Sequence, residues 1–427
     1  MPFDSGRVSF SRFMVHGDGP SAVDDTLLSI LSEHRFVETE IGTPDEVEVG
    51  FVTAEHLLDS GFTFEKTGFG PGGTLALFGL RMDTHKPPAD LKKAYRLMQE
   101  QAAATASPTG YASKGDKREA LDNADRQIRE ELAAGKHRKS KLIPMLWDLS
   151  RKELFTTASG NTVVEHLSRL MRQAFVVDLE PLTAGTAAMR VAAQAGRTRD
   201  HEDLSPTAFT KPPAEASGRA DAAEEVTAAV AGTPTVPWVA KSVDLKDFLG
   251  NEFLVWLWWR SETTEGPFEA GEAQVHAAFD KALDMDCAWG VGGRQSLRGD
   301  GPTRLGEAGE ALRNGKWPRK LGLLMSDGEV GFELTLAGDA YAVAGAKLPE
   351  AEEAQTRREV VEARLESVRL LSDLLDGMYA GFLKARTGGS WGSVQVPEIR
   401  AWIRDRAAAT VTSATAAEAP PALRMAE

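Results

Sequence analysis

The chain has 427 residues, of which 42% are hydrophobic and 26% are charged, and its formal net charge at pH 7 is −14. This composition is typical of a globular protein with roughly two or three domains, and it excludes a uniformly basic nucleic-acid binder. No apolar run reaches the about 18 residues of a membrane span, and the N-terminus has no secretory pattern. The one cysteine, Cys287, excludes a disulfide framework and a thiolate zinc site. We therefore expect a cytoplasmic protein with no membrane partner.

The first part of the chain predicts strands around one helix. Residues 8–15 and 47–52 have the short alternating or β-branched patterns of strands, and residues 74–82 form a nearly continuous apolar strand. Ser21 or Asp24 would cap the intervening helix.

Residues 86–141 predict a helical arm. Apolar residues recur at helical spacing on both sides of a Gly- and Pro-containing break at 107–114, which indicates a hairpin of two narrow-striped helices that projects from the domain. Residues 86–147 hold 13 Lys and Arg against 8 Asp and Glu, a local charge of +5, so the remainder carries −19. An acidic protein with one basic arm can bind DNA if the arm faces the duplex.

The end of the arm is the most basic stretch. Four cations precede an apolar turn that holds Pro144 and ends at Trp147: Lys136, Arg138, Lys139 and Lys141. Such a patch suits a polyanion, because Lys and Arg neutralise phosphates and release condensed counterions. A simpler interpretation is a solvated helix end followed by a core strand.

Composition also indicates the domain boundaries. We expect an N-terminal α+β domain at 1–182, which includes the arm at 86–141. Residues 183–236 are rich in Ala, Thr, Pro and Glu and predict a linker or disordered insertion. A second α+β domain should occupy 237–405, and residues 406–427 should form a flexible tail.

Within the second domain, a helix beginning at 242 carries the cluster Trp256-Leu257-Trp258-Trp259. Aromatic clusters can stack bases, but helical spacing favours a core role here. Residues 287–291 predict a short strand, 320–325 and 330–336 a hairpin around Asp327-Gly328, and 351–384 a long helix.

Enzyme signatures are missing from the sequence. There is no phosphate-binding Walker loop, dinucleotide fingerprint, His-Glu-x-x-His or nucleophile elbow. We predict no catalytic residue, no metal ligand and no cofactor. Because acidic residues are abundant, a metal-dependent nuclease stays open as an alternative.

The order of features resembles RdgC, the recombination-associated, ring-forming DNA-binding family of bacteria. The similar segments are Phe10 to Val15, Gly50-Phe51-Val52, Leu75 to Lys86, Leu142 to Trp147, Gly293 to Leu297, Asn314-Gly315-Lys316 and Lys320 to Leu323. The resemblance implies α+β subunits with mixed sheets that close as a ring-shaped homodimer around duplex DNA, with little sequence preference. It also implies an association with the nucleoid and with restraint of the recombinase RecA.

By position, the resemblance makes Trp147 an aromatic finger at a ring-closing interface, with Arg294 and Gln295 at the facing contact. Together with the charge pattern, it predicts these DNA contacts: Lys86, Lys92, Lys93, Lys114, Lys117, Arg118, Lys136, Arg138, Lys139, Lys141, Arg294 and Gln295. A further alternative is an acidic interaction protein that binds another protein, such as a recombinase, and no DNA.

Overall fold

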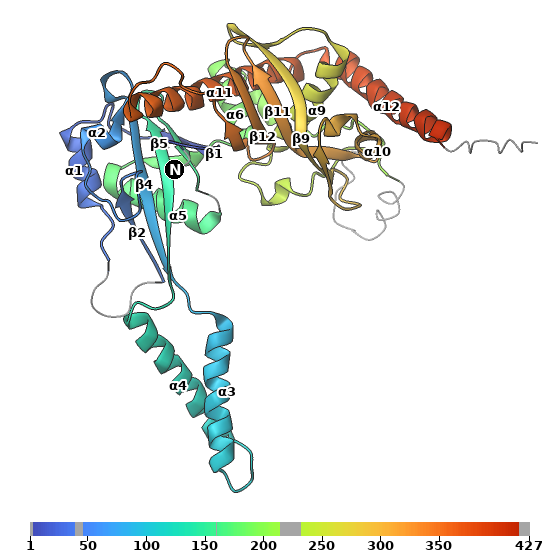
Figure 1. Ribbon diagram of the computed structural model, residues 1–427. Coiled ribbons are helices and arrows are strands. Elements are labelled where there is room, and N and C mark those ends of the chain that lie inside the picture. Colours follow the sequence, from blue (N-terminus) through green and yellow to red (C-terminus); the bar gives the residue numbers. More distant parts are fainter. Residues whose placement is uncertain (1–2, 39–45, 159, 214–231, 418–427) are drawn as a thin grey trace, which may run out of the picture. The chain divides into compact units, whose positions relative to one another are not determined.

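The computed structural model describes residues 3–38, 46–158, 160–213 and 232–417, with side chains described to residue 406 (Figure 1). The fold is mixed α+β, as the sequence predicts, but its main strand pairs are antiparallel and do not form the expected mixed sheets. The chain divides into two compact units: unit 1 contains Val15–Leu179, and unit 2 contains Pro2–Met14 with Glu180–Glu427. Within the described residues, no helix combines the length and apolar character that crossing a bilayer requires.

Unit 1 is built on a sheet with strand order β6-β5-β4-β2. Its strands are β2 (Val47–Val52), β3 (Gly68–Phe69), β4 (Leu75–His85), β5 (Arg138–Asp148) and β6 (Glu153–Thr156), and β1 (Val8–His16) and β7 (Asp178–Pro181) cross its boundary. Its helices are α1 (Asp25–Glu33), α2 (Phe64–Thr67), α3 (Ala89–Ala106), α4 (Lys114–Ala133) and α5 (Asn161–Phe175), with a 3-10 turn at Pro71–Gly73. The longest pairing joins β4 and β5 from Leu75 opposite Asp148 to His85 opposite Arg138.

Helix α5 closes the core of unit 1. Its buried side chains lie on one face, and Phe175 meets Trp147 of β5 edge to face, with ring centroids 5.1 Å apart. Phe51 of β2 packs on the same phenyl ring at 5.9 Å. Next to Phe51 in the chain, position 50 requires a glycine, because a Cβ on Gly50 would lie 2.3 Å from the Cα of Phe36.

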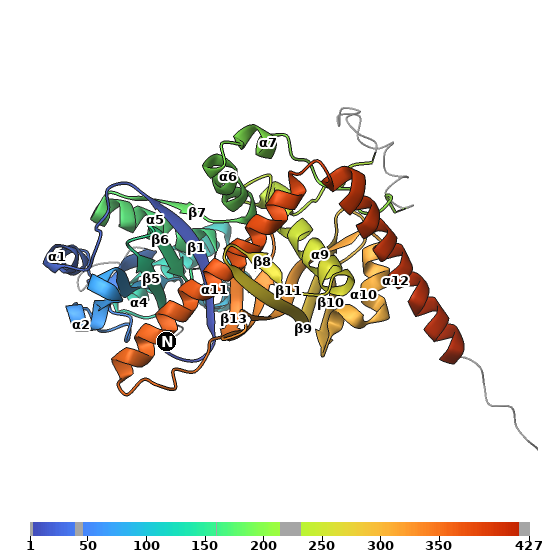
Figure 2. The ribbon, with the colours of Figure 1, turned by 90° about the horizontal axis from the view of Figure 1, so that it is seen from above.

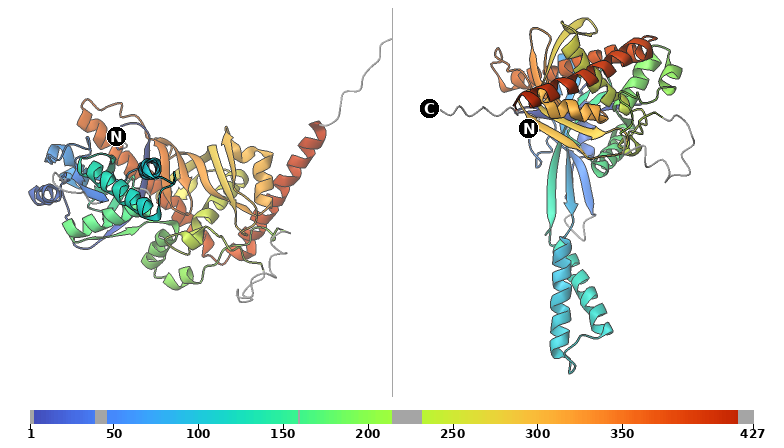
Figure 3. Two further views of the ribbon diagram at one scale, coloured as in Figure 1. Left: turned by 90° about the horizontal axis from the view of Figure 1, so that it is seen from below. Right: turned by 90° about the vertical axis from the view of Figure 1, so that its right-hand side faces the viewer.

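The arm is a hairpin of α3 and α4 that continues from the ends of β4 and β5 (Figure 3, right). Ser113 and Asp116 form a capping box at the start of α4. Contact between the helices is thin: α3 has no buried residue, and α4 buries only Ala120, Ala124 and Ile128. The predicted helical hairpin is confirmed.

The end of the predicted arm differs from expectation. The prediction of an apolar turn at Pro144 is wrong, because residues 138–148 form one continuous strand, β5. Pro144 pairs with Gly79 of β4 and lies just beyond the last β5–β6 pair, Met145 with Thr156. A proline is tolerated there because its missing N–H removes no ladder hydrogen bond on that side.

Unit 2 contains a second antiparallel sheet with strand order β10-β9-β11-β12-β13-β1. Its strands, besides β1, are β8 (Phe268–Ala270), β9 (Ala273–Cys287), β10 (Gln295–Gly299), β11 (Lys316–Ser326), β12 (Gly331–Ala337) and β13 (Ala342–Lys347). Its helices are α6 (Ala184–Gln194), α7 (Thr198–Glu202), α9 (Phe248–Thr263), α10 (Gly306–Arg313), α11 (Arg357–Arg386) and α12 (Val396–Ala417). Short 3-10 or π turns lie at Val239–Lys241, Pro302–Arg304 and Trp391–Gln395.

Helices α9 and α11 form the core of unit 2, and Figure 2 shows α11 crossing its strands. Every residue of α9 from Phe248 to Trp258 is buried. The core interpretation of the tryptophan cluster is therefore confirmed for Trp256 and Trp258, which are 3% and 0% exposed.

The predicted linker at 183–236 is wrong for its described first part, which forms α6 and α7. Small side chains let α6 approach its neighbours closely: a Cβ on Gly185 would lie 2.7 Å from Oδ1 of Asp244. Tyr379 of α11 donates to the carbonyl of Ala184 at 2.8 Å. Residues 214–231 of the predicted linker lie outside the described residues.

From the end of α7 the chain is held mainly through its backbone. Lys246 donates to the carbonyls of Glu202 and Leu204, and Arg400 donates to that of Ala208 at 2.6 and 2.9 Å. Phe209 is 2% exposed and packs edge to face on two tryptophans. We call residues 202–209 the captured segment.

Two other expectations are corrected in unit 2. The strand predicted at 287–291 is wrong, because Cys287 ends the long strand β9 and a turn follows. A positive φ of 64° at Lys281 marks an irregularity in β9, which hides its alternation in the sequence. The tail predicted from 406 is helical to Ala417 as part of α12, and 418–427 lie outside the described residues.

A polar cluster organises the loop after β2. The carboxylate of Asp59 accepts hydrogen bonds from Thr53 Oγ1 at 2.9 Å, Gly61 N at 2.9 Å and Lys66 Nζ at 2.7 Å. Burial alone would raise the pKa of Asp59, but these hydrogen bonds outweigh it and lower the pKa to about 2.

We expect Asp59→Asn to lower the free energy of unfolding at pH 7 by about 1 kcal/mol. A depressed folded-state pKa adds stability that is fully present above the unfolded-state pKa and is lost as the pH falls through about 2. The difference between wild type and variant should therefore shrink between about pH 4 and pH 2. Denaturant unfolding at several pH values measures it, with exposed Asp18→Asn as the control. A difference that does not change with pH would contradict this account.

Candidate nucleic-acid interface

Three predicted cations gather where the sheet of unit 1 passes into the arm. Lys139 and Lys141 lie on one face of β5, opposite Thr84 and Met82 of β4, because alternate residues of a strand face the same side. Lys86 directly follows β4. All three are exposed and form no ion pair with the described residues. We call Lys86, Lys139 and Lys141 the root cations.

Arg138 lies on the opposite face of β5 and is committed to carboxylates. It forms an ion pair with Glu38, and its Nε lies 3.7 Å from Oδ2 of the fully buried Asp83. Asp83 also accepts from Arg81 at 2.7 and 3.0 Å. The hydrogen bond to Glu38 is the main cause that raises the pKa of Arg138. Strand alternation thus gives Arg138 carboxylate partners on the face opposite Lys139 and Lys141, and its DNA contact stays a prediction.

The side chain of Lys136 is mostly exposed to solvent. Its Nζ lies 3.5 Å from Oε1 of Glu131, but the side chain is 61% exposed, and such surface pairs are weak. The neighbouring His137 contacts the other carboxylate oxygen of Glu131 at 2.7 Å. With a φ of 64°, His137 also makes the turn from α4 into β5.

The arm adds further cations. Lys92 on α3 forms an ion pair with Asp125 on α4, with an Nζ–Oδ1 distance of 2.5 Å, and so helps to join the two helices. Four other predicted contacts are exposed and form no ion pair with the described residues: Lys93, Lys114, Lys117 and Arg118. The structure thus presents unpaired cations along the arm as well as at its root.

Trp147 does not occupy an exposed position. Its side chain is 1% exposed, packs on Phe175 and lies against Gly19, where a Cβ would be 3.3 Å from the indole. The prediction of Trp147 as an exposed ring-closing finger is therefore wrong. The apolar run that ends at Trp147 is a core strand, which was the simpler interpretation of this stretch.

Arg294 and Gln295 lie in unit 2, at the start of β10. Arg294 is 79% exposed, and its Nε lies 3.1 Å from Oδ2 of Asp286. Gln295 donates to the carbonyl of Glu307 and accepts from Lys316, at 3.3 and 3.2 Å. Gln295 is thus occupied within the unit, and Arg294 is the more accessible of the two.

A concavity of about 520 Å³ brings Arg294 together with residues that the sequence did not suggest. Arg319 lies over the ring of Trp238 at 4.8 Å and pairs with Asp339 at 2.5 Å, and Lys241 also lines the space. These residues come from separate segments, so no local motif could have indicated them.

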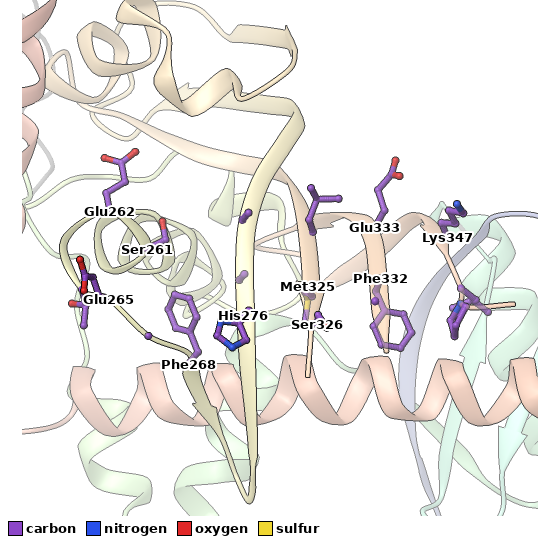
Figure 4. Close-up of a pocket in the computed structure, with 18 of the residues that line it drawn as sticks. Ser261, Glu262, Glu265, Phe268, His276, Met325, Ser326, Phe332, Glu333 and Lys347 are labelled. Atoms are coloured by element: carbon purple, nitrogen blue, oxygen red, sulfur yellow. The ribbon is translucent and has the colours of Figure 1, made fainter. Parts of the chain in front are cut away.

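A larger cleft of unit 2, about 1070 Å³, has a different character. Glu262 and Glu265 lie toward one end and Lys347 toward the other, with Glu333 beside it (Figure 4). Carboxylates repel phosphates, so this cleft does not extend a DNA-binding surface. Among the described residues, no group of three or more His, Cys, Asp or Glu side chains is placed to hold a metal ion.

The positions of the cations are the main structural evidence on function. The root cations and four arm cations face solvent, whereas Arg138 and Lys92 form ion pairs within unit 1. Comparisons with known proteins add nothing to this, since no protein-family model matches the chain and no curated protein is significantly similar to it.

Proposed function

We propose that the protein is a non-catalytic, RdgC-like protein that binds duplex DNA without sequence preference and encircles it as a ring-like homodimer. In this role it acts in the cytoplasm, on the nucleoid, and modulates homologous recombination by limiting the access of a RecA-type recombinase. One observation carries the DNA-binding part: the root cations and four arm cations are exposed and unpaired within the described residues, in a chain of net charge −14.

Phosphate binding needs this kind of surface. Lysine and arginine side chains that lack carboxylate partners can neutralise phosphates without first breaking an internal ion pair. Contacts to the backbone carry no sequence information, so they suit sequence-independent binding. Acidic residues elsewhere, such as Glu265 and Glu333 in the large cleft, discourage DNA from binding to those surfaces.

A ring retains DNA topologically, so a modest number of phosphate contacts is sufficient. Since Trp147 is buried, the ring-closing contact in this proposal falls to Arg294, the more accessible of the two facing residues. Recombinase restraint follows from the resemblance to RdgC and from occupancy of the duplex.

We expect the triple variant Lys86→Gln, Lys139→Gln, Lys141→Gln to bind linear duplex DNA more weakly. The slope of log K against log salt should fall by about 0.9 for each phosphate that is no longer neutralised, hence by up to about three units. Fluorescence anisotropy across a salt series, with and without magnesium, measures both quantities. The control Arg151→Gln, Arg169→Gln, Arg172→Gln removes three cations from unit 1 that already have partners, and should change the slope less.

Each outcome separates the candidates. An unchanged salt slope in the root variant would overturn the proposed DNA-binding surface. Magnesium-dependent shortening of the DNA would support the nuclease alternative. If the wild type binds no duplex even at low salt, the protein-interaction alternative replaces the proposal.

A further inference from the structure

A small pocket in unit 2 lies between helices α6, α7 and α11. Its volume is about 170 Å³. Much of its lining is apolar, with Val191 and Ala192 from α6 and Leu383 from α11. Arg197 and Asp200 also line it and pair with each other at 2.7 Å. The pocket therefore offers an apolar interior beside a neutralised pair of charges.

His201 of α7 is the buried polar side chain of this pocket. It is 3% exposed, and neither ring nitrogen has a hydrogen-bond partner within the described residues. Burial lowers the pKa of His201, although the charge of Asp244 and the nearby backbone of Gly185, which does not meet hydrogen-bond geometry with the ring, act in the opposite direction. Burial thus favours the neutral ring, which has one donor and one acceptor nitrogen. Buried polar groups without partners are costly and rare, so a bound molecule that pairs with this ring gains free energy.

We propose that this pocket binds a small, uncharged, mostly apolar molecule with one hydroxyl group, such as a monocyclic aromatic alcohol, whose hydroxyl pairs with His201. An apolar cavity of about 150 Å³ is large enough for benzene. A hydroxyl both donates and accepts, so it can pair with either ring nitrogen. Besides the mutually paired Arg197 and Asp200, the lining offers a charged ligand only Lys384, which is exposed to solvent, so the apolar interior suits an uncharged molecule. This binding site is independent of the proposed DNA interface.

Phenol and toluene are matched probes of similar size, because toluene carries a methyl group in place of the hydroxyl that His201 would bind. Isothermal titration of the full chain with phenol should give a Kd on the order of 0.1 mM, in line with the binding energy available to a seven-atom ligand. The informative quantity is the ratio of the toluene Kd to the phenol Kd. In His201→Leu this ratio should fall by about fivefold, which is the size of one net hydrogen bond. Comparing ratios cancels the different hydration of the two probes.

Two neighbouring alanines on α6 provide a matched pair of variants. Ala192 lines the pocket, so Ala192→Leu should fill it and abolish the binding of both probes. Ala193 is exposed and does not line it, so Ala193→Leu should leave both affinities unchanged. Toluene binding by His201→Leu would show that the pocket has kept its shape.

Three results would overturn the proposal. One is the absence of phenol binding by the wild type at tens of millimolar, a concentration well above the expected Kd. Another is phenol binding that survives in Ala192→Leu, which would place the ligand elsewhere. The third is an unchanged toluene-to-phenol ratio in His201→Leu, which would show that the imidazole makes no hydrogen bond to the ligand.

Discussion

Replacing Arg386 by Met is expected to lower the free energy of unfolding of unit 2 by about 3–5 kcal/mol, the usual cost of leaving one partner of a buried ion pair alone. Glu252 is 0% exposed and accepts from Arg386 Nε at 2.6 Å. Arg386 Nη2 also donates to the carbonyl of Ser205 at 2.6 Å, so the variant loosens the captured segment as well.

Chemical denaturation followed by tryptophan fluorescence measures this loss, because Trp391 packs beside the guanidinium of Arg386 at 5.2 Å. The matched control is Lys384→Met, two residues earlier on α11, where the side chain is exposed and forms no ion pair with the described residues. That variant should change stability by less than about 0.5 kcal/mol. If Arg386→Met also changes the free energy of unfolding by less than about 0.5 kcal/mol, Glu252 is not shielded from water as described.

Replacing Trp147 by Ala should lower the free energy of unfolding of unit 1 by about 3–5 kcal/mol, as expected for a large aromatic side chain removed from a packed core. The indole fills the space between Phe175 and Gly19, and neither neighbour can collapse fully into the cavity that remains. The size of this effect distinguishes a core residue from an interface residue, because an exposed finger contributes little to the stability of the single subunit.

Tyr111 is the control for this experiment, since it is 80% exposed and lies between α3 and α4 of the arm. Tyr111→Ala should leave the unfolding transition nearly unchanged. Analytical ultracentrifugation should accompany the denaturation curves. If Trp147→Ala kept its stability within about 1 kcal/mol but dissociated a dimer, the interface assignment would be restored.

Helical periodicity made much of the fold predictable. The apolar stripes predicted the hairpin of α3 and α4, and α11, whose described bounds are Arg357–Arg386. The Asp327-Gly328 pair marked the turn between β11 and β12. These elements bury side chains at regular intervals, and such intervals are visible in a sequence without any tertiary information.

Elements stabilised by distant partners were not predictable in this way. Helix α6 has no large apolar stripe, and its packing depends on small residues that fit against Asp244 and Tyr379. Strand β9 is interrupted at Lys281, so its alternation changes phase. At the candidate interface the basic stretch was visible in the sequence, but the direction in which each cation faces was not. Because Pro144 indicated a turn, the strand Arg138–Asp148 was not predicted. The alternation that places Arg138 on one face and Lys139 and Lys141 on the other was therefore missed.

The captured segment has a consequence for how this part of the chain can evolve. Lys246, Arg386 and Arg400 contact its carbonyl groups, which every amino acid possesses. Apart from Phe209, which needs its aromatic pocket, and Thr207, whose hydroxyl meets Trp391, few side chains in the segment are specified. Substitutions at Ser205 or Ala208 can therefore accumulate without moving the backbone. The chain can acquire new surface chemistry here, including new recognition or modification sequences, while its path across unit 2 stays the same.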